Sequence, residues 1–175
     1  MIFIKYILIF FIFAISIIIG NSYSKKYSVR EKELKEILNI LNVIKAKIKF
    51  TGQGIHEIFE QICIINQDNI GNMFKMANEF MEEECASASF EKAADLLEKN
   101  SSLNKEDIEA IKSFSKMLGN TDIEGQVSQI ELVENLIKKQ IEQATEEKRK
   151  NSKLYKTLGV TAGLTITIIL IYYLK

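Results

Sequence analysis

The sequence predicts an all-α protein, an antiparallel helical bundle between an N-terminal and a C-terminal transmembrane helix. Three observations support this fold class. Both ends of the 175-residue chain are long apolar segments, apolar residues between them recur at helical spacings, and proline is absent. Without proline, the breaks between helices fall to glycines and polar clusters.

Residues 1–20 are predicted to form the first transmembrane helix. Crossing a hydrocarbon core of about 30 Å takes about 20 apolar residues, and Lys5 is the only charge in this segment. A secretory signal is the alternative, but such signals place cations before the apolar run and a small-residue cleavage site after it. Here the cations follow the run, and no A-x-A motif ends it.

Basic residues flank the inner ends of both apolar segments. Five Lys or Arg lie between residues 25 and 35, and five more between residues 148 and 156. Cytoplasmic segments carry such an excess of cations, so region 21–157 is predicted to be a cytoplasmic bundle with a polar stalk. The formal net charge is zero and no basic stripe stands out, so nucleic acid is not expected as a partner.

The first bundle helix is predicted to begin at Ser28, because Ser28 and Glu31 form a capping-box pattern. Apolar residues recur at spacings of three and four up to residue 48, and Gly52 and Gly54 then end the helix. Further helices are expected over 55–62, from about 73 and from about 89.

A fifth helix is predicted over 104–118, with Gly119 as the left-handed residue after its end. The last helix begins at Gln126 and meets no breaker before the membrane segment, so it is predicted to be one rod about 74 Å long. Cys63 and Cys85 stand far apart on apolar faces, which predicts buried free thiols.

Residues 158–174 are predicted to be the second transmembrane helix, short but uncharged, with tyrosines at its end. Gly159 and Gly163 form a G-x-x-x-G motif, which lets another helix approach closely because both glycines share one face. That helix is either the first span or a partner, and Thr165 and Thr167 could hydrogen-bond across the contact.

Candidate catalytic and metal-binding residues are few. His56 is the only histidine, and with Glu57 and Glu60 it could bind a metal or move protons, but no second histidine stands at ligand spacing. The run Glu82-Glu83-Glu84 points in different directions on a helix. No phosphate-binding loop or catalytic serine motif occurs, so no catalytic residue, cofactor or metal is expected.

Three stretches carry a family resemblance: KYSVREKELKEILNILNVIKAKIKFTG, LGNTDIEGQVSQIELVENLI and KNSKLYKTLGVTAGLTITIILI. They resemble the stage III sporulation protein AB family of endospore-forming bacteria over nearly the whole chain. Gly119, Gly125, Gln126 and Gly159 match the family pattern in type and spacing. The chain departs from it at 51–55, where TGQGI replaces Thr-Pro-Leu, and this puts a partner contact through that turn in doubt.

The resemblance implies a non-enzymatic platform or scaffold subunit of the sporulation channel complex, in the mother-cell membrane facing the forespore and needed for forespore development. Members are also similar to the cytoplasmic domain of type II secretion and type IV pilus platform proteins. The implied partners are membrane lipid, other stage III sporulation channel proteins and the stage III sporulation protein AA ATPase, and a homo-oligomer stays open. The alternative is a two-span membrane sensor or receptor, whose domain would usually face outward and precede a signalling module.

Overall fold

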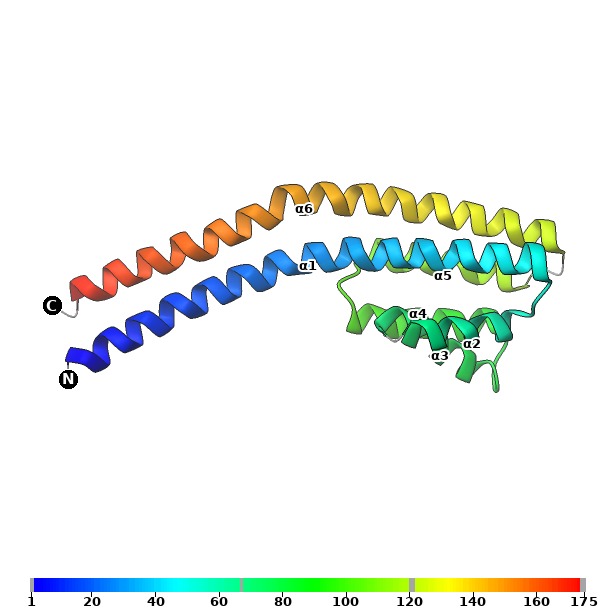
Figure 1. Cartoon of the computed structure of the whole chain (residues 1–175), viewed down its shortest axis with the longest axis horizontal. Helices are drawn as coiled ribbons and strands as arrows, with labels where there is room; N and C mark the ends of the chain where they lie inside the picture. Colours follow the sequence, from blue (N-terminus) through cyan, green and yellow to red (C-terminus); the bar gives the residue numbers. More distant parts are fainter. Residues whose placement is uncertain (1, 67, 120–121, 174–175) are drawn as a thin grey trace. The chain divides into compact units, whose positions relative to one another are not determined.

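The computed structural model describes residues 2–66, 68–119 and 122–173, and all regular structure within these ranges is helical. The predicted all-α class is confirmed. The elements are α1 (Ile2–Thr51), α2 (Ile55–Ile65), α3 (Asn69–Phe80), α4 (Ala86–Asn100), α5 (Lys105–Lys112), the 3-10 helix η1 (Ser113–Gly119) and α6 (Ile123–Tyr173) (Figure 1).

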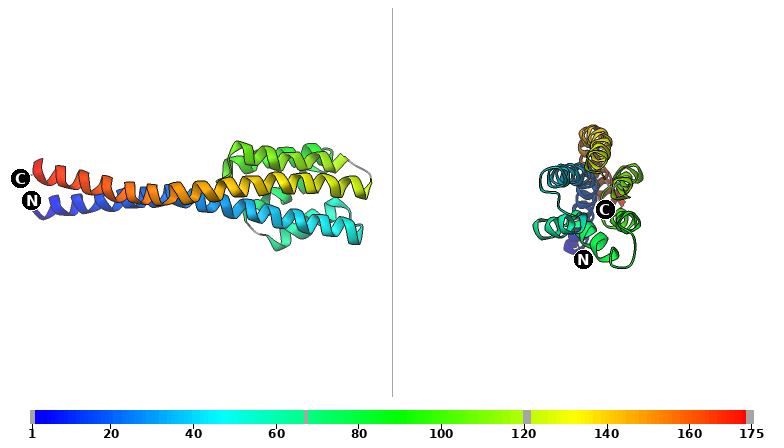
Figure 2. Two further views of the ribbon diagram at one scale, coloured as in Figure 1. Left: turned by 90° about the horizontal axis from the view of Figure 1, so that it is seen from above. Right: turned by 90° about the vertical axis from the view of Figure 1, so that its right-hand side faces the viewer.

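These elements form two compact units. Residues 1–29 and 144–175 form the helix-pair unit, in which the first part of α1 and the last part of α6 run antiparallel and side by side (Figure 1). Residues 30–143 form the bundle unit, in which α2 to α5 pack with the remaining parts of α1 and α6 (Figure 2). Both long helices therefore contribute to both units.

Helices α1 and α6 are each long and apolar enough to cross a membrane. The most apolar 18-residue stretches of the two helices have mean hydropathies of 2.1 and 1.7, respectively. Only 17% of the first stretch and 6% of the second is buried within the protein. The core helix of a water-soluble protein would bury most of such a stretch. The exposed apolar surface therefore fits a membrane protein.

The helix start predicted at Ser28 is wrong, because α1 runs unbroken from Ile2 to Thr51. A capping pattern marks a start only when the preceding residues leave the helix. Here no proline interrupts the helix before Ser28, so its amide can keep an ordinary helical partner. Helix α6 begins at Ile123, before the predicted Gln126, and Asp122 caps it by accepting a 2.6 Å hydrogen bond from the amide of Gly125.

The break predicted at Gly52 is confirmed, whereas several other helix ends differ from prediction by a few residues. Helix α1 ends before Gly52, which adopts a left-handed φ of 63°, and α3 begins after Asp68, whose carboxylate accepts from two amides of its first turn. The predicted fifth helix is α-helical only to Lys112, and η1 then continues to Gly119. Gly119 thus ends a 3-10 helix and does not follow an α-helix.

Four phenylalanines from four different elements form the centre of the bundle unit. Phe59 of α2 lies 5.0 Å from Phe74 of α3, and Phe90 of α4 lies 4.9 Å from Phe114 of η1, measured between ring centroids. None of the four is more than 1% exposed. Burial of each ring stabilises the fold by about 2 kcal/mol, which fixes the short helices against one another.

The two cysteines are free thiols, as predicted, but Cys85 is not buried. It is the residue before the first turn of α4, where it is exposed to solvent. Cys63 is partly buried on α2. The prediction for Cys85 fails because α4 begins after it, so that no helix face carries it into the core.

The two units carry opposite charge, which the zero net charge of the chain conceals. The bundle unit contains 14 Lys or Arg and 21 Asp or Glu, a formal net charge of −7 with histidine neutral. The helix-pair unit contains 9 Lys or Arg and 2 Asp or Glu, a net charge of +7. The basic residues beside the apolar segments account for nearly all of this excess.

Candidate functional sites, a glycine seam and a groove

The two glycines of the G-x-x-x-G motif lie against the first helix of the same chain. A Cβ atom on Gly159 would stand 3.0 Å from the Cα of Gly20 and 3.0 Å from the carbonyl oxygen of Ser16. A Cβ atom on Gly163 would stand 2.9 Å from the ring of Phe13. We call this contact the glycine seam. Hydrogen atoms in place of side chains let the two backbones approach this closely.

Gly20 is a seam residue that sequence reasoning missed. A Cβ atom there would stand 2.9 Å from the Cα of Gly159 and 2.7 Å from the carbonyl oxygen of Tyr155. A signal for it existed in the sequence, since Ser16, Gly20 and Ser24 follow one another at a spacing of four. Small residues at this spacing share one helix face and are typical of close helix packing.

Serine hydroxyls provide hydrogen bonds across the seam. Ser16 Oγ donates to the carbonyl oxygen of Gly159 at 2.7 Å, and the hydroxyls of Ser24 and Ser152 lie 2.6 Å apart. The prediction that Thr165 bonds across the helices is wrong, because its hydroxyl donates at 2.9 Å to the carbonyl oxygen of Thr161 in its own helix. Hydrogen bonds thus join the helices on both sides of the Gly20–Gly159 contact.

Three tyrosines stack where the apolar segments give way to the basic residues. The ring centroids of Tyr23 and Tyr27 lie 5.7 and 5.8 Å from that of Tyr155, with the planes within about 22° of parallel. Tyrosine has an apolar ring and a polar hydroxyl, and it is enriched at membrane–water interfaces. The stack therefore fits the headgroup level of a membrane.

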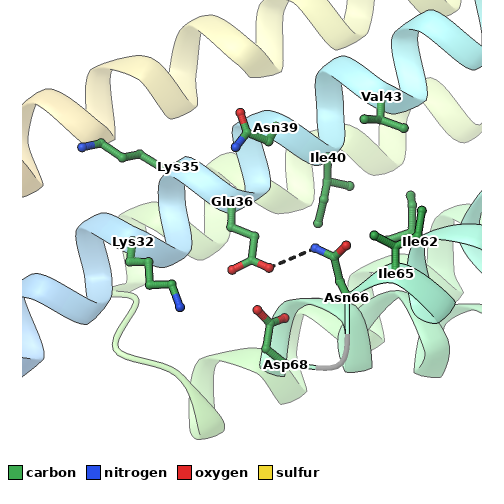
Figure 3. A pocket seen from close by; sticks show the side chains of 10 residues that line it. All are labelled: Lys32, Lys35, Glu36, Asn39, Ile40, Val43, Ile62, Ile65, Asn66 and Asp68. Atoms are coloured by element: carbon green, nitrogen blue, oxygen red, sulfur yellow. Dashed lines mark hydrogen bonds between the residues drawn. The ribbon is translucent and has the colours of Figure 1, made fainter.

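A groove of about 490 Å³ lies in the bundle unit between α1, α2 and the turn leading to α3 (Figure 3). We call it the α1–α2 groove. Ile40 and Ile62 form its buried apolar floor, whereas Val43 and Ile65 on its rim are 44% and 75% exposed. Polar residues line its other end, namely Lys32, Lys35, Glu36, Asn39, Asn66 and Asp68.

Two carboxyl groups, those of Glu36 and Asp68, face each other at the polar end (Figure 3). Burial and the neighbouring Asp68 raise the pKa of Glu36 to about 7, although Asn66 donates to its carboxylate at 2.9 Å. Burial acts to raise the pKa of Asp68 as well, but hydrogen bonds from Glu36 and from two α3 amides outweigh it and lower that pKa. Asp68 caps α3 as an anion, so Glu36 carries the proton that the pair shares near neutral pH.

The remaining family-pattern positions lie at the start of α6. Gly125 and Gln126 belong to its first turn, and residues 120 and 121 lie outside the described ranges. A Cβ atom on Gly125 would stand 2.8 Å from the capping carboxylate of Asp122. Gly125 therefore leaves room for the cap, and Gln126 lines a cavity of about 250 Å³ together with Ile48.

The residues weighed for metal binding are spread over α2 and the turn after α3. His56 is exposed on α2, and Glu82 to Glu84 are exposed in the turn, where Glu84 pairs with Lys92 at 2.9 Å. Within the part of the chain that the structure describes, no three His, Cys, Asp or Glu side chains stand close enough to hold a metal ion.

Comparison with known proteins gives matches over most of the chain. The family model described as Stage III sporulation protein AB matches residues 5–171. Stage III sporulation protein AB of Bacillus subtilis (strain 168) is 24% identical over 153 residues, which cover 86% of this chain and 90% of that protein. A solved structure of Stage III sporulation protein AB (SpoIIIAB) has a TM-score of 0.64 at 19% identity, covering 69% of this chain and 96% of that one.

Proposed function

Because this chain belongs to the stage III sporulation protein AB family and has a role in sporulation, we propose that it is a non-enzymatic scaffold subunit of the sporulation channel complex in the mother-cell membrane. The family match over residues 5–171, combined with two helices that are apolar enough to cross a membrane, carries this proposal. Family membership also indicates that it works with other stage III sporulation proteins.

In this proposal residues 1–20 and 158–174 span the membrane, and region 21–157 is cytoplasmic. Seven of the nine Lys or Arg residues of the helix-pair unit lie beside the inner ends of the two spans, and only Lys5 and Lys175 lie toward the outer ends. This asymmetry supports the orientation, because cytoplasmic leaflets are anionic and attract cations beside membrane spans. Gly159 and Gly163 pack the second span against the first, and Gly119, Gly125 and Gln126 shape the turn into α6. Two paired spans would fix the protein in the bilayer more firmly than one.

The bundle unit is the part that we propose as the docking platform. The family resembles the platform proteins of type II secretion and type IV pilus machines, so the proposed neighbour is the stage III sporulation protein AA ATPase. This step rests on analogy between folds. The fully packed phenylalanine centre supports it, because a platform has to keep its shape while a partner acts on it.

Deletion of the gene tests the scaffold role. Vegetative growth should be normal, and forespore development should stop after engulfment. Complementation with wild type or with Ala162→Leu, a change on the exposed face of α6, should restore spores, whereas Gly159→Leu, which disrupts the glycine seam, should not. A deletion strain that sporulates like its parent would overturn the proposal.

A topology measurement separates the scaffold from the sensor alternative. A protease-sensitive tag inserted at Glu83, which is exposed in the turn after α3, is expected to survive protease treatment of intact protoplasts and to be cut after lysis. Cleavage in intact protoplasts would place the bundle outside the cell, as a receptor requires. Pull-down of the ATPase from sporulating cells then tests the docking step.

A further inference from the structure

The residues that line the α1–α2 groove all belong to the bundle unit. We propose that it docks a helical segment of a partner protein that presents one arginine or lysine, with apolar residues four and seven positions away. The inference rests on the proposed scaffold function, since a scaffold needs a partner surface. The test uses purified protein and measures peptide binding alone. A negative result would therefore overturn this inference without changing the sporulation result of the deletion strain.

The apolar half of the groove fits one face of a helix. Ile40 and Ile62 close the floor, and Val43 and Ile65 leave much of their apolar surface in solvent on the two rims. Helices that bind grooves insert apolar side chains spaced by three and four residues. Glu36, Ile40 and Val43 stand at positions i, i+4 and i+7 of α1, so a helix lying along α1 presents its own side chains at the same intervals.

The polar half of the groove favours a cation. The carboxyl groups of Glu36 and Asp68 lie together, and both belong to a unit of net charge −7. The positive charge of Lys32 acts to lower the pKa of both carboxyl groups, and Glu33 adds a further carboxyl group beside Asp68. Lys35 is already paired with Glu31 at 2.5 Å, one turn earlier on α1. An arginine or lysine entering the groove would replace the shared proton.

This replacement couples docking to pH. The pKa of Glu36 is raised to about 7, so its ionised fraction increases about tenfold between pH 6 and pH 8. A cationic segment binds the ionised pair, so it should bind up to about tenfold more tightly at pH 8. An acidic segment directed at Lys32 would show the opposite trend, and a purely apolar segment would show none.

Peptide binding to the full-length protein tests the inference. The protein is placed in nanodiscs of neutral phosphatidylcholine, which do not attract basic peptides, and titrated with a labelled helical peptide built on alanine and glutamine. This peptide carries a central arginine with leucines four and seven positions to either side. Two matched peptides carry glutamate or norleucine in place of the arginine, and fluorescence anisotropy gives Kd at pH 6 and pH 8.

Four variants separate the two halves of the groove. Glu36→Gln should abolish the pH dependence, and Ile65→Ser should weaken binding about tenfold at both pH values. The controls Glu83→Gln and Leu132→Ser, exposed at other sites of the bundle unit, should bind like wild type, and circular dichroism should show unchanged helix content in all four. Tighter binding of the glutamate peptide, no binding of the arginine peptide, or equal binding by all variants would overturn the inference.

Discussion

Arg30 binds Asp107 in a buried ion pair with two hydrogen bonds. Arg30 Nε donates to Asp107 Oδ2 at 2.7 Å, and Nη2 donates to Oδ1 at 3.0 Å. The side chains are 6% and 0% exposed. Asp107 Oδ2 also accepts from the amide of Asn104 at 2.9 Å, as part of the capping box of α5. One carboxylate therefore joins the bundle part of α1 to the first turn of α5.

Replacing Asp107 should destabilise the bundle. Asp107→Ala removes the buried carboxylate that receives both hydrogen bonds from Arg30, and it removes half of the α5 capping box. The expected loss is about 3–5 kcal/mol in the free energy of unfolding, measured by urea unfolding of the full chain in detergent micelles. Glu109→Ala is the control, because Glu109 is 74% exposed and pairs with Lys112 at 3.6 Å. Its loss should stay below about 1 kcal/mol.

Gly71 should tolerate no side chain. A Cβ atom there would overlap the carbonyl oxygen of Asn66, which belongs to the backbone and cannot rotate away. Gly71→Ala should therefore displace the start of α3 and lower the melting temperature by several degrees, because forced overpacking costs about 1–3 kcal/mol or more. Gly54→Ala is the control, since nothing lies within 4 Å of its added Cβ. Equal melting temperatures would contradict the packing at Gly71.

The glycine seam should be detectable by cross-linking. Ser24→Cys with Ser152→Cys, in a chain whose Cys63 and Cys85 are replaced by serine, brings two thiols to positions whose hydroxyls lie 2.6 Å apart. Mild oxidation should form an intramolecular disulfide, seen as a faster band on a non-reducing gel. Ser24→Cys with Lys153→Cys should not cross-link, because Lys153 is exposed on another face.

The same cross-link reports on the glycines themselves. Adding Gly159→Leu to the Ser24→Cys and Ser152→Cys pair should reduce its yield, because the larger side chain pushes the helices apart. Ala162→Leu lies on the exposed face of the same helix and should leave the yield unchanged. An undiminished yield in the Gly159→Leu chain would show that this glycine does not set the helix separation.

Glu36 should make stability depend on pH. Its folded pKa of about 7 lies above the ordinary value of 4.5, so the folded state binds the proton more tightly than the unfolded state. This contribution is complete below about pH 4.5 and is lost as the pH rises through 7. Glu36→Gln stays neutral, so at pH 8 it should be more stable than wild type by up to about 1 kcal/mol, given solvent screening.

Thermal melting of Glu36→Gln and wild type between pH 5 and pH 8.5 measures this difference. The two curves should converge near pH 5 and separate as the pH rises. Glu83→Gln, which changes an exposed carboxylate in the turn after α3, is the control and should melt within a degree or so of wild type, because isolated surface charges contribute little to stability. A constant difference for Glu36→Gln as well would show that burial and Asp68 do not raise the pKa of Glu36.

The sequence was sufficient for the helical class and for most helix positions, because these depend on local patterns. The apolar spacing from Leu34 to Ile48 and the break at Gly52 are properties of adjacent residues, and the structure bears both out. The predicted helix start at Ser28 was wrong, because a capping pattern does not begin a helix when the preceding residues are themselves helical. At Ser28 the continuous backbone hydrogen bonds of α1 outweigh the local preference of this sequence for a helix start.

The candidate sites were less predictable because their parts are distant in sequence. The motif at Gly159 and Gly163 indicated close packing, but only the fold shows that Gly20 and Ser16 lie opposite. Glu36 and Asp68 belong to different elements, and neither stands in a recognisable pattern. Their mutual effect on pKa arises only after α1 and the turn before α3 come together.

The opposite charges of the two units have a consequence for how copies of this protein would crowd together. Neighbours inserted in one bilayer with the same orientation meet cation to cation and anion to anion. Acidic lipids would neutralise the cationic units, a basic partner bound to the bundle units would relieve the repulsion between those units, and salt would screen both. Lateral spacing would then be set jointly by the lipid mixture and by whatever occupies the bundle.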